Sequence, residues 1–173
     1  MRTERVIRGG RVVADTWMYW GLDEGELAQP LPPGPVLVPL AYWKERRDSL
    51  LARGAPVGVW LAPADEPATL AKDLPALPLI AVHFPKFTDG RGHSTAVLLR
   101  TRLGYRGELR AFGDVGRDQL YYLRRCGFDA FALAPHRDPE SALASLDDFS
   151  VCYQGSAEDP RPLFRYREAA RHG

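Results

Sequence analysis

Cysteine is scarce in this chain of 173 residues. Only Cys126 and Cys152 occur, and they form neither a CxxC pair nor a spacing that is typical of metal ligands. A count of two also excludes a disulfide-rich scaffold. We therefore expect two buried thiols in a reducing compartment, and a redox pair is the less favoured interpretation.

Long hydrophobic runs are absent as well. No apolar stretch approaches the roughly 20 residues that a membrane-spanning helix needs. Residues 1–10 are charged and lack the apolar core of a signal peptide. The net charge is only +1, so no strong overall field attracts nucleic acid or an anionic membrane. We expect a cytoplasmic protein that binds neither.

Several catalytic and cofactor motifs are missing. Gly90 and Gly92 are followed by Ala96 rather than by a third glycine, which disfavours dinucleotide binding through GxGxxG. A Walker loop, HExxH and GxSxG do not occur. The histidines have no i, i+4 spacing on one helix, so we expect no metal site. The sequence leaves the cofactor, if there is one, unknown.

What is present fits one domain with a sizeable core, since 45% of the residues are hydrophobic and 26% are charged. Residues 1–20 predict a β-hairpin at Gly9-Gly10, followed by an aromatic run for which simple packing is favoured over a self-association surface. Residues 27–35 form a proline-rich connection. Residues 155–173 predict an irregular tail.

Between these segments, short apolar runs alternate with helical patterns. The predicted strands are 36–40, 56–61, 79–84, 108–112, 128–133 and 149–153, and the predicted helices are 42–53, 67–73, 94–103, 117–126 and 139–146. This alternation indicates an α/β fold, with a mostly parallel sheet of about six strands and helices packed on it. Either an open doubly wound sheet or a partial barrel fits, because six strands are too few for a closed eight-stranded barrel.

Ligands of parallel α/β proteins bind beyond the carboxyl ends of the strands, where loops and helix N-termini meet. The polar residues predicted at this edge include His83, His93, Asp114 and His136. Imidazole and carboxylate groups can move protons near neutral pH, so these four are the candidate catalytic residues.

The loop Asp89-Gly90-Arg91-Gly92-His93-Ser94 is the most suggestive part of that edge. The glycines allow a tight turn, the guanidinium of Arg91 can hold an oxyanion, and Ser94 can begin the following helix. Asp89, Gly90, Arg91, Gly92 and Ser94 are therefore the predicted anion-binding residues. In the alternative interpretation, Asp89 and Arg91 only tie the loop together and Ser94 is only an N-cap.

Residues 84–94, FPKFTDGRGHS, resemble the FPxFxDGRGxS signature of the bacterial domain of unknown function 934 family. The resemblance continues through residues 103–131 and extends over about 35–167. In that family the position of His93 is often aromatic, which argues against a general catalytic role for this histidine.

Members of that family are typically encoded beside assimilatory sulfite reductase. The resemblance therefore implies an accessory protein or an oxidoreductase of assimilatory sulfite reduction, with an oxyanion or phosphate bound at the 89–94 loop. The alternative is a non-catalytic partner or maturation factor of sulfite reductase. The resemblance carries over no catalytic residue. A two-fold homodimer is the expectation for oligomeric state from base rates alone.

Overall fold

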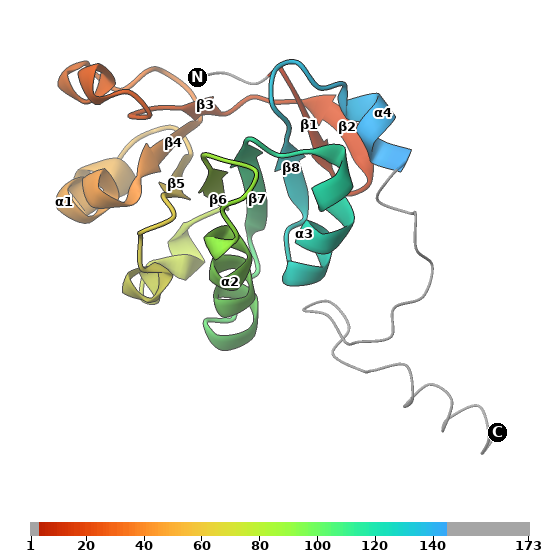
Figure 1. Cartoon of the computed structure of the whole chain (residues 1–173). Helices are drawn as coiled ribbons and strands as arrows, with labels where there is room; N and C mark the ends of the chain where they lie inside the picture. The colour runs from red at the N-terminus through yellow and green to blue at the C-terminus, as the bar shows by residue number, and fades with distance from the viewer. Residues whose placement is uncertain (1–3, 145–173) are drawn as a thin grey trace.

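The computed structural model describes residues 4–144, so the predicted strand 149–153, Cys152 and the predicted tail 155–173 lie outside the described residues. One sheet contains eight strands in the order β2-β1-β8-β7-β6-β5-β4-β3. Strands β3 to β8 run parallel, whereas β1 is antiparallel to both of its neighbours. The sheet curls into a half-barrel (Figure 1).

The bounds of the elements are as follows. The strands are β1 (Arg5–Arg8), β2 (Arg11–Ala14), β3 (Met18–Tyr19), β4 (Val36–Pro39), β5 (Val57–Leu61), β6 (Leu79–Phe84), β7 (Glu108–Gly113) and β8 (Ala130–Ala132). The α-helices are α1 (Leu40–Leu51), α2 (Arg91–Val97), α3 (Leu120–Cys126) and α4 (Pro139–Leu143). The short 3-10 turns are η1 (Glu24–Ala28), η2 (Pro67–Leu70), η3 (Leu74–Ala76) and η5 (Arg117–Gln119), and η4 (Leu98–Arg102) is a π-helical turn.

The mostly parallel sheet is confirmed, and five of the predicted apolar runs are β4 to β8. Such runs are easy to find because parallel strands buried on both faces are apolar along their whole length. The strand count is higher than predicted, since β1, β2 and β3 also join the sheet. The open doubly wound alternative is wrong, because helices α1, α2 and α3 lie along one face only (Figure 1).

The curl of the sheet has a simple covalent cause. Its two edge strands, β2 and β3, belong to one segment, residues 11–19, and only residues 15–17 separate them. Asp15 N–H donates to the Glu4 carbonyl at 3.0 Å on one side, and Met18 N–H donates to the Pro35 carbonyl at 3.1 Å on the other. A connection of this length spans at most about 14 Å, so the two edges must approach each other.

Two layers of apolar side chains follow from this arrangement. The larger layer lies between the sheet and the helices and includes Val59, Ile80 and Phe84. The smaller one lines the concave face and includes Tyr19 and Phe112, whose ring centroids are 4.5 Å apart. Alternate residues of each strand supply the two layers, as the period of two in a β-strand requires.

The N-terminal hairpin is confirmed, and it is part of the main sheet. Gly9 and Gly10 have φ angles of +56° and +70°, which a two-residue hairpin turn requires at both central positions. In the aromatic run that follows, Tyr19 and Trp20 are buried. The packing interpretation is therefore correct for these two residues, and the self-association surface is wrong for them.

Helix predictions differ more from the structure. The predicted helix 67–73 is replaced by the 3-10 turn η2 and a further turn at 71–73, and the second 3-10 turn, η3, follows them. Both 3-10 turns have a proline in their first two positions. The predicted N-cap at Asp138 is confirmed, since its carboxylate accepts the Ser141 N–H at 2.9 Å.

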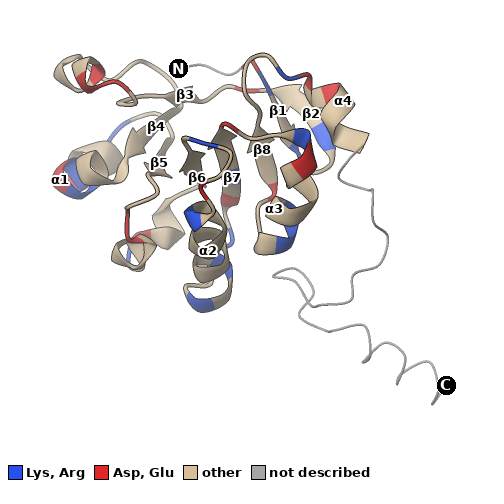
Figure 2. Cartoon of the chain, viewed as in Figure 1, with Lys and Arg blue, Asp and Glu red and all other residues tan. Residues whose placement is uncertain are grey.

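Within residues 4–144, no helix has both the length and the apolar character needed to cross a membrane. In Figure 2, α1 contains both basic and acidic residues, whereas the charged residues within α2 and α3 are all basic.

Candidate functional site

The family-like motif occupies the loop after β6, and a second loop, residues 114–119, lies beside it. The two loops are adjacent because β6 and β7 pair in parallel up to Phe84 and Gly113, so both chains leave the sheet at the same edge. Asp114 N–H donates to the Phe84 carbonyl at 2.7 Å and fixes the second loop against the first.

Arg91 does not present a free guanidinium at this edge. Its Nε lies 2.9 Å from Asp89 Oδ1, and its Nη2 lies 2.7 Å from Asp89 Oδ2. These two guanidinium donors are therefore hydrogen-bonded to one carboxylate. The hydrogen bonds from Arg91 lower the pKa of Asp89 to about 2. This geometry is the loop tie that the sequence left as the alternative to anion binding.

Helix α2 begins at Arg91, not at Ser94, so the predicted start of the helix is wrong. The physical reason is that Asp89 stabilises the turn that begins the helix. Its Oδ1 accepts the Arg91 N–H at 3.2 Å, and the Gly90 carbonyl accepts the His93 N–H at 3.1 Å. Ser94 is consequently an exposed residue inside the helix and not its N-cap.

Gly92 and His93 pack against the sheet. A Cβ on Gly92 would lie 2.5 Å from Phe84 Cζ, so only glycine allows the helix to sit this close to the ring. The ring of His93 lies 5.4 Å from Phe84 and 5.0 Å from Tyr122, and its Nδ1 is 3.1 Å from the Gly90 carbonyl oxygen. An aromatic ring at position 93 could make the two ring contacts but not the contact with the Gly90 carbonyl.

His83 lies on the opposite face of the sheet from His93. Its ring stacks on Phe112 at 4.7 Å and meets the edge of Trp60 at 6.1 Å, both on the concave side. Burial lowers the pKa of His83 below its ordinary value. The structure therefore does not bring the two histidines together.

The remaining catalytic candidates also have separate surroundings. Asp114 Oδ2 accepts the Phe87 N–H at 3.0 Å. His136 is exposed and makes no hydrogen bond within residues 4–144. Its neighbour Arg137 approaches Asp114 Oδ1 at 3.7 Å through Nη2, while its Nε is buried without a hydrogen-bond partner.

Phe87 is held in an unusual way for an exposed residue. Asp114 accepts its N–H, and Gln119 Nε2 donates to its carbonyl at 3.2 Å, so both of its backbone polar groups are bound by side chains. Its own side chain is nevertheless 46% exposed. Tyr122 (54% exposed) lies one helical turn after Gln119 and contacts His93.

Val97 follows His93 by one turn of α2 and is 40% exposed. His93 and Tyr122 are in ring contact, and the exposed residues Phe87 and Val97 belong to the loop after β6 and to α2; we call these four residues the aromatic patch.

The family whose description is "Bacterial protein of unknown function (DUF934)" matches residues 58–164. That range covers more than half of the chain and includes the whole 84–94 motif. The chain belongs to this family. No curated protein and no solved structure matches the chain.

Within this DUF934 chain, the signature residues are explained largely by local structure. Asp89 and Arg91 fix the loop, Gly92 permits close packing on Phe84, and the loop residue Phe87 is left projecting. The described residues contain no group of three or more His, Cys, Asp or Glu side chains that could hold a metal ion. Cys126 is buried, and burial raises the pKa of its thiol.

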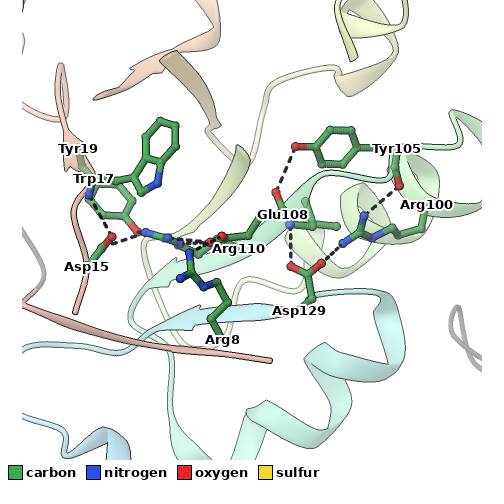
Figure 3. A network of polar contacts seen from close by, with 10 residues as sticks. Arg8, Asp15, Trp17, Tyr19, Arg100, Tyr105, Glu108, Arg110 and Asp129 are labelled. Carbon is green, nitrogen blue, oxygen red and sulfur yellow. Dashed lines mark hydrogen bonds and ion pairs between the residues drawn. The ribbon is translucent and has the colours of Figure 1, made fainter. Parts of the chain in front are cut away.

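Sequence reasoning did not find the polar network inside the half-barrel. Arg110 on β7 is fully buried and contacts Asp15 at 2.9 Å, Glu108 at 2.6 Å and the Tyr19 hydroxyl at 3.1 Å (Figure 3). The only signal was the alternation of Glu108, Arg110 and Phe112 in an otherwise apolar strand. This network connects β7 to the segment that joins both sheet edges.

The Asp89–Arg91 pair predicts an acid-sensitive contribution to stability. The folded-state pKa of Asp89, about 2, is below its ordinary value of 3.8, so the stabilisation is complete above about pH 4 and is lost as the pH falls through 2. We expect Arg91→Gln to lower the thermal midpoint near neutral pH, and the difference from the wild type to vanish below pH 2. Thermal unfolding followed by circular dichroism from pH 1.5 to 7 measures this, and Arg102→Gln is the exposed control. A difference that does not change with pH would contradict the assignment.

Proposed function

We propose that this protein is a non-catalytic accessory protein of assimilatory sulfite reduction and that it docks on sulfite reductase through the aromatic patch. The observation that supports this is Phe87, whose backbone is bound on both sides while its ring is left in solvent. A rigidly presented aromatic side chain loses little conformational entropy when it enters a partner's pocket.

The chemistry of the partner follows from the patch and from the family. Three members of the patch, Phe87, Val97 and Tyr122, are exposed large hydrophobic residues, and exposed aromatic residues are enriched at docking surfaces. Sulfite reductase is the partner that the gene neighbourhood of the family implies. The ring of Phe87 should therefore enter a pocket on the surface of sulfite reductase.

Phe87→Ala should weaken binding to sulfite reductase by about 30-fold or more, the loss of roughly 2 kcal/mol that defines a binding hot spot. The thermal midpoint should change little, because the ring is exposed. Isothermal titration calorimetry of the two purified proteins measures the affinity.

Leu27→Ala is the matched control for this experiment, because Leu27 has a similar exposure of 43% and belongs to η1, not to the patch. It should bind as the wild type does. Wild-type protein that shows no binding to sulfite reductase at micromolar concentrations, or equal effects of the two substitutions, would contradict the proposal.

A second candidate function, as an oxidoreductase of sulfite reduction that holds an oxyanion, is favoured by a different residue. Arg137 lies at the carboxyl edge of the sheet with a buried, unpartnered Nε, and its Nη1 would be 2.9 Å from a Cβ at Gly116. Its ion pair with Asp114, at 3.7 Å, is too long for a hydrogen bond. Arg137, not Arg91, is thus the better candidate to bind an oxyanion.

Under this second function, sulfite, sulfate or phosphate at about 100 times its dissociation constant should stabilise the protein by roughly 2.7 kcal/mol. Arg137→Gln should abolish the stabilisation, and Arg91→Gln should preserve it because Asp89 already occupies that guanidinium. Thermal unfolding with and without each anion measures both. If Arg91→Gln abolished the stabilisation by the anion and Arg137→Gln did not, the anion would bind at the 89–94 loop and not at Arg137.

A further inference from the structure

A cleft opens at the amino ends of the strands, at the opposite edge of the sheet from the aromatic patch. Its volume is about 980 Å³, which is at the upper end of the range for small-molecule sites. The lining includes Pro56, Pro78 and Gly107, which directly precede or closely approach the starts of β5, β6 and β7.

The lining of the cleft is partly apolar and partly polar. Trp43, Leu50, Leu74, Leu77 and Tyr105 lie in its walls and are almost fully buried, while the exposed apolar side chains of the lining include Leu51, Pro75 and Ala76. Trp43 is fixed by a 2.9 Å hydrogen bond from its indole N–H to Asp73, and the Tyr105 hydroxyl donates to the Leu77 carbonyl at 3.0 Å. Because the large rings are held in place, the cleft is preformed.

The charges in the lining have one sign. Of the described residues that line the cleft, the only charged ones are Arg53 and Arg106. Arg53 is held by a hydrogen bond from Nη2 to the Pro32 carbonyl, while its Nη1 is buried and has no hydrogen-bond partner. Arg106 is exposed and has no hydrogen bond or ion pair within residues 4–144. Two positive charges with no carboxylate among the lining residues favour an anionic group in the cleft, and the exposed Arg106 guanidinium can donate hydrogen bonds to it.

We propose that this cleft binds a small molecule with a flat apolar body and one anionic group, a carboxylate, sulfonate or phosphate. The body lies against the exposed side chains of Leu51, Pro75 and Ala76, and the anionic group is attracted by the guanidinium groups of Arg53 and Arg106. The chemistry is independent of the aromatic patch, since the two surfaces share no residue.

The probe for this site is 8-anilinonaphthalene-1-sulfonate, which combines an aromatic body with one sulfonate and fluoresces in apolar surroundings. We expect saturable binding to the native full-length chain, and at least about tenfold weaker binding to the double variant Arg53→Gln/Arg106→Gln. The neutral analogue N-phenyl-1-naphthylamine should bind the wild type and the double variant equally. Arg102→Gln, an exposed arginine outside the cleft, should leave both affinities unchanged.

A second variant keeps the test decisive if the loss of the Arg53–Pro32 contact disturbs folding. Ala76 is exposed on the rim of the cleft, so Ala76→Trp should fill the entrance without affecting the core and should weaken both probes. Near-UV circular dichroism checks that each protein keeps native packing, because loosely packed states also bind the sulfonate probe. Absence of saturable binding to the native wild type, or affinities that are equal in all variants, would overturn the proposal.

Discussion

Arg110→Leu should lower the free energy of unfolding by about 3–5 kcal/mol, the usual cost of removing one partner from a buried ion pair. Arg110 and Asp15 have almost no side-chain exposure, and Arg110 Nη1 lies 2.9 Å from Asp15 Oδ2. Leucine would remove the arginine partner of the buried Asp15 carboxylate and leave in place its hydrogen bond from the Trp17 N–H, at 3.1 Å. Equilibrium unfolding in urea measures the change.

Two further variants separate the buried charge from other effects of this substitution. Arg8→Leu removes an exposed arginine that lies 3.5 Å from Glu108 and should cost less than about 1 kcal/mol. Adding Asp15→Asn to Arg110→Leu should recover part of the loss, because the amide removes the uncompensated charge at position 15. An Arg110→Leu protein within 1 kcal/mol of the wild type would show that the network does not stabilise the closure of the sheet.

Gly113→Ala should cost at least about 3 kcal/mol, which is large for the addition of one methyl group. Gly113 has a φ of +105°, and a Cβ there would lie 2.3 Å from the Phe84 carbonyl oxygen and 2.9 Å from His83 Cδ2. The clash is with backbone, so a side-chain rotation cannot relieve it. The position is where β7 must turn to place Asp114 beside the motif loop.

The control for this variant is Gly90→Ala. Gly90 has a φ of −79° and open space where a Cβ would be, so alanine should change the free energy of unfolding by about 1 kcal/mol or less. Urea unfolding of the two variants in parallel gives the comparison. Equal losses would mean that the loop geometry described for these glycines does not hold in solution.

Much of the fold could be predicted because the physical signals are local. The apolar runs of β4 to β8 and the Gly9-Gly10 turn each depend on a few adjacent residues. The two-residue strand β3 could not be predicted, because it is too short for any periodicity and depends on pairing with Val36 and Leu37. The half-barrel depends on the same long-range pairing.

The local structure of the 89–94 loop could be predicted less well, for a related reason. The sequence places Arg91 in a polar, glycine-bearing loop, but whether its guanidinium is free depends on the conformation of Asp89 two residues earlier. Likewise, an aromatic residue such as Phe87 is ordinarily expected to be buried. Its exposure follows from Asp114 and Gln119, which are distant in sequence and close only once β6 and β7 pair.

The most direct test of the docking proposal is photo-crosslinking from position 87 in cells that grow on sulfate as their sulfur source. Phe87 is replaced by the photoreactive p-benzoyl-phenylalanine, and Leu27 is replaced in the same way in a control strain. The account predicts a crosslink to sulfite reductase from position 87 and none from position 27. Equal crosslinking from both positions, or no crosslink to sulfite reductase from position 87, would contradict it.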